Sequence, residues 1–188
     1  MGLTSREHWV LTHGLFLGTL FLLVCGGSLV ALWTLRPGLN TSEGVQGRMK
    51  LLRVGLGATA AIAWALVITG TWIIYPWYRV KLAGAKFDKC AGLELPSSAC
   101  SSRDFLLSNV AGETEMWHKF GMEWKEHLAW GAPFLATSAL LLTLFYGPRI
   151  IARPWLRNVL IVMLVSALVA VVLAGGLGAA IGKVAPVS

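Results

Sequence analysis

The sequence has little charge and no familiar catalytic motif. Only 13% of its 188 residues are charged, and nine are Asp or Glu, whereas soluble domains carry roughly 25% charged residues. Three cysteines are too few for the disulfide framework of a small secreted domain. The chain lacks a HExxH zinc-protease motif, a phosphate-binding P-loop and a GxSxG nucleophile motif. These absences exclude a disulfide scaffold and argue against a soluble enzyme, in particular a hydrolase.

Apolar residues make up 56% of the chain and gather in four uncharged runs, at about 11–33, 54–75, 128–146 and 159–181. About 20 apolar residues cross a bilayer as a helix, and in lipid the backbone must satisfy its hydrogen bonds within that helix. The sequence therefore predicts an all-α fold, an integral membrane four-helix bundle that forms a single membrane domain over 1–188. An outer loop with a juxtamembrane helix, about 76–127, would join the second and third spans.

The basic residues predict the orientation of the chain. Seven of them flank the two shorter connections between the runs, where the only acid is Glu43; they are Arg36, Arg48, Lys50, Arg53, Arg149, Arg153 and Arg157. By the positive-inside rule these connections lie in the cytoplasm. Both termini and the long loop would then be extracytoplasmic, in the inner (plasma) membrane of a bacterium. The net charge of +7 indicates topology and not a nucleic-acid patch, since no cluster of Lys and Arg occurs.

Two of the three cysteines lie in the long loop. An oxidising extracytoplasmic compartment permits a disulfide between Cys90 and Cys100, and we expect one there in preference to two free thiols or metal ligands. The closed loop would add about 2–3 kcal/mol of stability in the chain-entropy model. Cys25 lies within the first run and is expected to be a packing residue.

All four histidines fall on the predicted outer side, and this clustering is the main functional signal. Within each pair the offset is five or nine residues, which turns a helix by about 140° or 180°. Only one histidine of each pair can therefore face a shared site. The deeper two, His13 and His127, are predicted to face it. His8 and His118 would then form any second site.

Several residues extend the predicted site around the two deeper histidines. Glu123 and Gly131 lie one turn before and one turn after His127, so all three share a helix face. Gly14 and Gly18 form a small-xxx-small pair beside the histidine of the first run, a pattern typical of helix contacts. The glycines would leave room for a flat cofactor. Glu123 would orient His127 or help a proton to leave.

The predicted cofactor is one haem b near the outer face, ligated by His13 and His127, because histidine is an axial haem ligand and bundle cores hold cofactors. A chlorophyll-type pigment uses the same ligand chemistry and stays open as an alternative. Otherwise the histidines would bond to lipid headgroups, to carbonyls or to Glu123. A non-haem metal is less well supported, because the Glu-x-x-His spacing of di-iron bundles occurs once, at Glu115 and His118, without partner glutamates on the other helices.

Two segments resemble a family of poorly characterised bacterial four-span membrane proteins: TWIIYPWYR at 71–79 and WHKFGMEWKEHLAW at 117–130. This resemblance covers most of the chain and implies the four-span fold, without an established activity. The placement of the histidines also resembles that of small membrane b-type cytochromes, which implies haem ligands on the helices. Two-haem arrangements of that kind need ligands at both membrane depths. The one-sided histidines here therefore argue against electron transfer across the bilayer by this chain alone.

These features predict a haem-binding or redox-associated membrane subunit that acts in electron transfer within a larger respiratory or photosynthetic complex. Its partners would be other membrane subunits, lipid, and a quinone or an extracytoplasmic cytochrome. The alternative is a cofactor-free structural or accessory subunit that docks through its outer tryptophans and the loop at 90–100. Either form is expected to be non-catalytic. A small-solute transporter is disfavoured, because the runs hold no charged residue.

Overall fold

The computed structural model describes residues 2–35, 42–79, 90, 100–109 and 112–185. The elements in these ranges are helices, and none of the residues described belongs to a strand. Four helical stretches are long and apolar enough to cross a membrane, and each contains one of the predicted runs: Ser5–Thr34, Gly44–Tyr78, Trp117–Ile150 and Pro154–Val184. The prediction of an all-helical chain with four such helices is confirmed.

The first two stretches each contain a π-helical segment. The first consists of α1 (Ser5–Val10), η1 (Leu11–Leu17) and α2 (Gly18–Thr34). A capping box begins it, because Thr4 and Glu7 each accept a hydrogen bond from the other's backbone N–H. The second stretch consists of α3 (Ser42–Thr69), η2 (Gly70–Ile74) and α4 (Tyr75–Tyr78). Both η segments are π-helices.

The third and fourth stretches are joined by a short turn. A third π-helical segment, η4 (Trp117–Met122), leads into α6 (Glu123–Tyr146), and the 3-10 turn η5 (Gly147–Ile150) ends this stretch. The φ angle of Gly147 is 51°, a left-handed conformation that glycine adopts without strain. The fourth stretch, α7 (Pro154–Val184), begins with a proline, whose missing N–H costs no hydrogen bond in a first turn.

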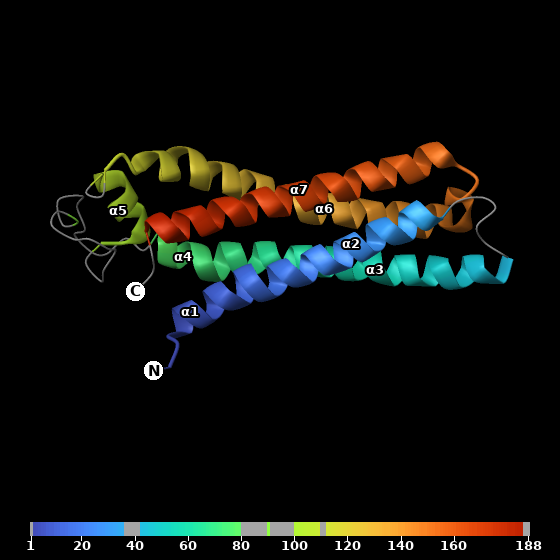
Figure 1. Cartoon of the computed structure of the whole chain (residues 1–188), viewed down its shortest axis with the longest axis horizontal. Coiled ribbons are helices and arrows are strands. Elements are labelled where there is room, and N and C mark those ends of the chain that lie inside the picture. The colour runs from blue at the N-terminus through green and yellow to red at the C-terminus, as the bar shows by residue number, and fades with distance from the viewer. Residues whose placement is uncertain (1, 36–41, 80–89, 91–99, 110–111, 186–188) are drawn as a thin grey trace.

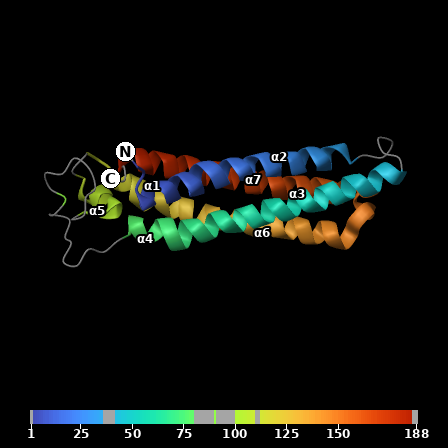
Figure 2. The ribbon, with the colours of Figure 1, turned by 90° about the horizontal axis from the view of Figure 1, so that it is seen from below.

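The long helices pack side by side as a ring. α2 contacts α3 and α7, and α6 contacts the same two helices, as Figures 1 and 2 show. The core inside the ring takes apolar side chains from all four stretches, for example Phe21, Leu56, Ala136 and Leu164. The outside is apolar too: Phe145 is 77% exposed, and many other large apolar side chains share that surface. A soluble monomer rarely exposes so large an apolar area.

A short helix covers one end of the ring. α5 (Ser102–Ser108) buries two apolar side chains in a cluster that includes Tyr78 of the second stretch, Met122 of the third and Ile181 of the fourth. Arg6 of the first stretch donates a hydrogen bond of 3.3 Å to the hydroxyl of the first residue of α5. α5 is thus linked to all four stretches through this cluster and hydrogen bond, and it lies at the end where Figure 1 places both termini.

Local hydrogen bonds fix the connection from α5 to η4. Asn109 ends α5 with a φ of 52°, and its side-chain oxygen accepts a bond of 3.0 Å from the Thr114 N–H. The Thr114 hydroxyl donates to the Leu106 carbonyl at 2.8 Å. We name Cys90 together with residues 100–109 the cap, the end of the ring beneath it the cap end, and the opposite end the loop end.

All three π-helical segments lie at the cap end of the ring (Figure 1). A π turn is closed by i→i+5 hydrogen bonds, so it holds one more residue than an α turn and changes which side chains face inward. Such segments are rare and occur often at functional sites. The irregular backbone of the molecule is thus concentrated where three of the four stretches meet the cap.

Candidate functional site

His13 of η1 is half-buried and faces the second stretch. Its Nδ1 lies 2.8 Å from the Thr69 hydroxyl oxygen. That hydroxyl has one hydrogen, which it donates to the Ala65 carbonyl at 2.7 Å, so the imidazole N–H donates to Thr69. A neutral His13 therefore carries its proton on Nδ1 and keeps a lone pair on Nε2. The ring offers a hydrogen-bond acceptor to a further group.

Gly70, the first residue of η2, makes room for this imidazole. A Cβ at Gly70 would lie 3.0 Å from Cε1 of His13 and 3.5 Å from Nε2. The first distance is shorter than nearly all real Cβ contacts. Any larger residue at this position would therefore displace the ring of His13.

Lys125 of α6 lies against α7. A Cβ at Gly178 would lie 3.2 Å from both Cε and Nζ of Lys125, so this glycine accommodates the end of the lysine side chain. Within the part of the chain that the structure describes, Lys125 has no hydrogen bond or ion pair. Its charge is thus free to bind another group.

Glu126, the next residue of α6, faces the second stretch instead. The Tyr75 hydroxyl donates a hydrogen bond of 3.1 Å to Oε2 of Glu126. Oε1 is buried and has no hydrogen-bond partner among the described residues. A buried carboxylate oxygen without a donor is costly, so this atom is suited to take a proton or a donor from a ligand.

A second buried polar pair lies under the cap. Tyr78 and His118 are both buried, and the Tyr78 hydroxyl lies 2.8 Å from Nδ1 of His118. The ring of Tyr78 also stacks on that of Tyr75, with centroids 6.2 Å apart. The two tyrosines thereby connect the buried histidine with Glu126.

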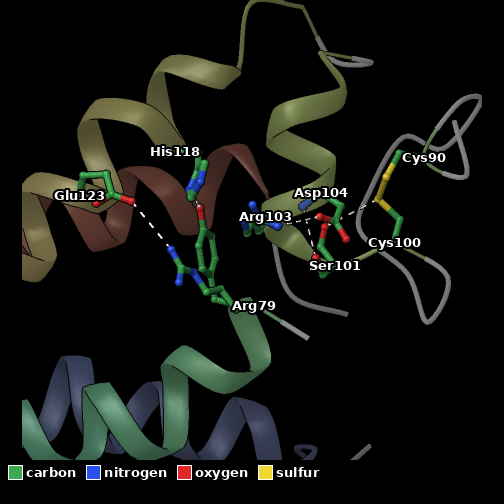
Figure 3. Close-up of polar contacts among 9 residues, drawn as sticks. Arg79, Cys90, Cys100, Ser101, Arg103, Asp104, His118 and Glu123 are labelled. Carbon is green, nitrogen blue, oxygen red and sulfur yellow. Dashed lines mark hydrogen bonds and ion pairs between the residues drawn. A yellow bond between two sulfur atoms is a disulfide. The ribbon is translucent and has the colours of Figure 1, made fainter. Parts of the chain in front are cut away.

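A weaker ion pair lies at the rim of this region. The Arg79 guanidinium is 3.9 Å from the Glu123 carboxylate, with side chains 46% and 43% exposed, and Figure 3 draws the pair beside His118. Exposed pairs of this kind contribute little to stability. Arg79 also lies over the Tyr75 ring, 4.9 Å from its centroid. The rim can therefore rearrange at low cost.

The structure places the two predicted haem ligands in different environments. His13 is half-buried against the second stretch, whereas His127 is exposed. Nδ1 of His127 donates to the carbonyl of Glu123, one turn earlier in the same helix, at 2.7 Å. No described contact brings His127 to His13. The axial pair stays a prediction, and the structure adds no support to it.

The other predicted site residues are also dispersed. A Cβ added at Gly14, Gly18 or Gly131 would meet nothing within 4 Å, so these glycines are open positions and not close helix contacts. His8 is exposed on α1, while His118 is paired with a tyrosine under the cap. Among the residues described, no group of three or more His, Cys, Asp or Glu side chains is placed to hold a metal ion.

The predicted disulfide is confirmed. Cys90 and Cys100 are bonded, with Cα atoms 5.4 Å apart, and Figure 3 shows the bond beside α5. Cys25 is free and buried, and its thiol donates a weak hydrogen bond of 3.7 Å to the Leu164 carbonyl. Arg36 lies outside the described residues, and so do 80–89, 91–99 and 110–111 of the loop predicted at about 76–127.

Comparison of the chain with protein-family models, with curated protein sequences and with solved structures finds no match. The resemblance to four-span bacterial proteins therefore stays a prediction. The function has to be argued from the contacts at the cap end.

Lys125 and Glu126 are the main residues that sequence reasoning missed. Both precede the uncharged run at 128–146, in the stretch predicted as a juxtamembrane helix of the outer loop, where only Glu123 and His127 were predicted to face the site. Helical register could have indicated Lys125, because Lys125 lies seven residues, or two turns, before the buried Ala132 and so shares its helix face. His127 is two residues further along the helix, about 200° around its axis, and faces outward.

Proposed function

We propose that the protein is an integral membrane subunit associated with electron transfer, and that it binds a small redox-active molecule at the cap end. Four long apolar helices and an apolar exterior support insertion into a bilayer. The subunit is non-catalytic by itself. Its partners are other membrane subunits and lipid, with an extracytoplasmic cytochrome as a further candidate.

We place the cap end outside the cytoplasm, in the inner membrane of a bacterium. The disulfide of the cap supports this orientation, because disulfides persist in oxidising compartments. The exposed basic residues at the loop end support it as well, by the positive-inside rule; they include Arg53, Arg149 and Arg153. Both termini are then extracytoplasmic.

One observation carries the proposal: histidine and glutamate side chains enter the helix ring at the cap end. Buried or half-buried there are His13, His118 and Glu126. In the described part of the spans nearer the loop end, the fully buried polar side chains are hydroxyls, those of Ser28, Thr59 and Thr143, and the half-buried Arg157 donates to a backbone carbonyl. Ionisable groups inside a membrane protein are costly and mark binding sites or proton relays.

A quinone-type carrier suits this site best. It dissolves in the bilayer, and its ring oxygens accept and donate hydrogen bonds and exchange protons, which matches the mixed donors and acceptors at the cap end. A haem b or a chlorophyll-type pigment between His13 and His127 is less well supported, because His127 points away from the ring of helices. Nε2 of the exposed His127 could ligate a cofactor only at the outside of the helix ring, where a partner subunit would have to supply the second ligand.

The test is the ligand content of the protein purified in mild detergent. Solvent extraction followed by chromatography should yield about one quinone per chain, and the amount should fall in the Glu126→Gln variant while His8→Ala, a change at an exposed position, leaves it unaltered. A visible spectrum with metal analysis belongs to the same experiment. A Soret band that disappears in His127→Ala would instead support the haem. Absence of both quinone and chromophore contradicts the proposal.

The alternative function is that of a cofactor-free accessory subunit. The cap favours it, because α5 shares an apolar cluster with residues of the second, third and fourth stretches and is hydrogen-bonded to Arg6 of the first, which gives a partner a surface on which to dock. Replacement of His13 with Ala separates the two functions. Loss of ligand from an intact complex supports the redox subunit, whereas loss of complex assembly with no ligand in either protein supports the accessory subunit.

A further inference from the structure

The turn between the third and fourth stretches holds two arginine side chains at the loop end (Figure 1). A Cβ at Gly147 would lie 3.2 Å from Nη2 of Arg53, so this guanidinium of α3 lies against the first residue of η5. Cζ of Arg153, the residue directly before α7, lies over the Tyr146 ring, 5.6 Å from its centroid. Tyr146 and Gly147 are consecutive, so the two guanidiniums contact neighbouring residues of one turn.

Neither arginine has a counter-ion in the part of the chain that the structure describes. The salt bridges found there all lie at the cap end, and the segments 44–53 and 146–157 contain no Asp or Glu. Arg53 and Arg153 are exposed, and neither side chain has a hydrogen bond to another described residue. A guanidinium stays charged and carries five N–H donors in a planar fork. Each arginine therefore offers a complete fork to an anion with paired oxygens.

The side chains around this turn indicate that it lies at the surface of the bilayer. Leu51 and Val54, close to Arg53 on α3, are 65% and 62% exposed. Phe145, near the end of α6, is exposed as well. Trp155, at the start of α7, is 58% exposed, and tryptophan is enriched at the level of the lipid headgroups. In the inserted chain the two guanidiniums therefore lie at the depth of the lipid phosphates, next to apolar side chains that suit acyl chains.

We infer that this turn is a binding site for anionic phospholipids, whose phosphate groups accept hydrogen bonds from Arg53 and Arg153. The paired oxygens of a phosphate match the guanidinium fork, and arginines without counter-ions favour a headgroup with a net negative charge. The contacts with Gly147 and Tyr146 hold the guanidiniums in place before a lipid arrives, so less side-chain freedom is lost on binding. The site lies at the loop end and does not depend on the redox ligand proposed for the cap end.

Native mass spectrometry of the full chain in a mild detergent measures the binding of individual lipids. Phosphatidylglycerol or phosphatidylcholine with the same acyl chains is titrated in, and the lipid-bound fraction gives the Kd. Phosphatidylglycerol should bind about tenfold more tightly than phosphatidylcholine, the usual effect of one charge-assisted hydrogen bond. Arg53→Gln and Arg153→Gln should each remove most of this preference, while the binding of phosphatidylcholine stays the same.

Two matched controls separate a built site from diffuse charge. Arg149 is an exposed arginine of the same turn, but among the described residues no ring or glycine contact holds its guanidinium in place. Arg149→Gln should therefore bind phosphatidylglycerol nearly as tightly as the wild type does. Tyr146→Leu keeps every charge but removes the ring under Arg153, and it should weaken binding by up to about fivefold, the value of an exposed cation–π contact. Phe145→Leu should leave binding unchanged. Thermal unfolding of each variant within a few degrees of the wild type shows that the fold is retained.

Three results would overturn the inference, and none of them touches the proposed redox ligand. The first is equal binding of both lipids to the wild type. The second is a loss of preference in Arg149→Gln as large as in the other two arginine variants, because the positive charge then acts diffusely. The third is displacement of phosphatidylglycerol by inorganic phosphate at the same concentration. Inorganic phosphate has no acyl chains to lie on the exposed apolar side chains, so at a lipid site it should compete far less well.

Discussion

Single glycines decide where polar side chains enter this helix ring. Besides Gly70 and Gly178, Gly55 lies under the hydroxyl of Ser28, with a Cβ position only 2.7 Å from Oγ, and Gly147 lies 3.2 Å from Arg53 Nη2 by the same measure. In each case the end of a polar side chain from a neighbouring stretch fills the space that a Cβ would take. Glycine here serves side-chain placement more than close approach of two backbones, the usual role of small residues between membrane helices.

Gly55→Ala is therefore expected to lower stability. The added methyl group forces the Ser28 hydroxyl from its bond to the Val24 carbonyl, and overpacking of this kind costs about 1–3 kcal/mol. The thermal unfolding temperature in detergent should fall. Gly57→Ala, where a Cβ meets nothing within 4 Å, should leave it unchanged or raise it.

The double variant Ser28→Ala with Gly55→Ala isolates the cause. Removal of the hydroxyl leaves Cβ atoms about as far apart as an ordinary contact, 3.8 Å, so the two substitutions together should be less harmful than their sum. Simple additivity of the two effects would show that the clash with Ser28 is not the reason for the loss of stability.

At the scale of elements, the apolar runs predicted the helices but not their full length. The structure extends each helix past its uncharged run, for example from 128 back to Trp117. Hydropathy reports which residues suit lipid, whereas a helix continues wherever capping and packing stabilise it. The groups nearest to the proposed site, Lys125 and Glu126, lie in such an extension. Glu123 and His127 were predicted as site residues in this same stretch, but the hydropathy of the runs does not show that Lys125 and Glu126 face the other helices.

The π-helical segments explain a second difference. In regular α-helical register, Gly14 shares the face of the buried Phe21, seven residues later. The wider turn of η1 rotates the preceding residues, so that His13 contacts the second stretch while Gly14 is exposed. Nothing in the sequence marks a π turn. The sequence therefore predicted the first helix, but not which of its side chains face the second stretch.

The cap is the element whose stability depends on covalent chemistry. The disulfide joins Cys90 to the start of the segment that carries α5. Its reduction, or Cys100→Ser, should lower the free energy of unfolding by about 2–3 kcal/mol in the chain-entropy model. The measurement is thermal unfolding with and without dithiothreitol. The double variant Cys90→Ser, Cys100→Ser should be insensitive to dithiothreitol; a continued response would assign the effect to another group.

At the scale of the whole molecule, the two ends differ in chemistry. The salt bridges found among the described residues, Arg79–Glu123, Arg103–Asp104 and Lys119–Glu115, all lie at the cap end. The loop end carries arginines instead, and Arg157 donates to the Leu35 carbonyl at 2.9 Å. An excess of positive charge at one end of the helices is the feature that orients membrane proteins by the positive-inside rule.

The orientation is tested with reporter fusions. Alkaline phosphatase joined after residue 188 should be active in a bacterial host, because the proposal places that end outside the cytoplasm, and a green fluorescent protein at the same position should be dark. Fusions after Arg153, in the turn at the loop end, should show the reverse. The same reporter active at both positions would refute the four-span topology, and an exchanged pattern would refute the orientation.

The contacts of the cap also set an order of events during synthesis. The cap packs in one cluster with Ile181 of α7 and Ala185 just after it, which leave the ribosome after every other helix of the ring. Its apolar side chains, Phe105 and Leu106, stay uncovered until α7 has been inserted. A chain that stalls or is truncated before that point displays a hydrophobic, protease-sensitive segment. Burial of the cap side chains is therefore complete only after α7 has been inserted.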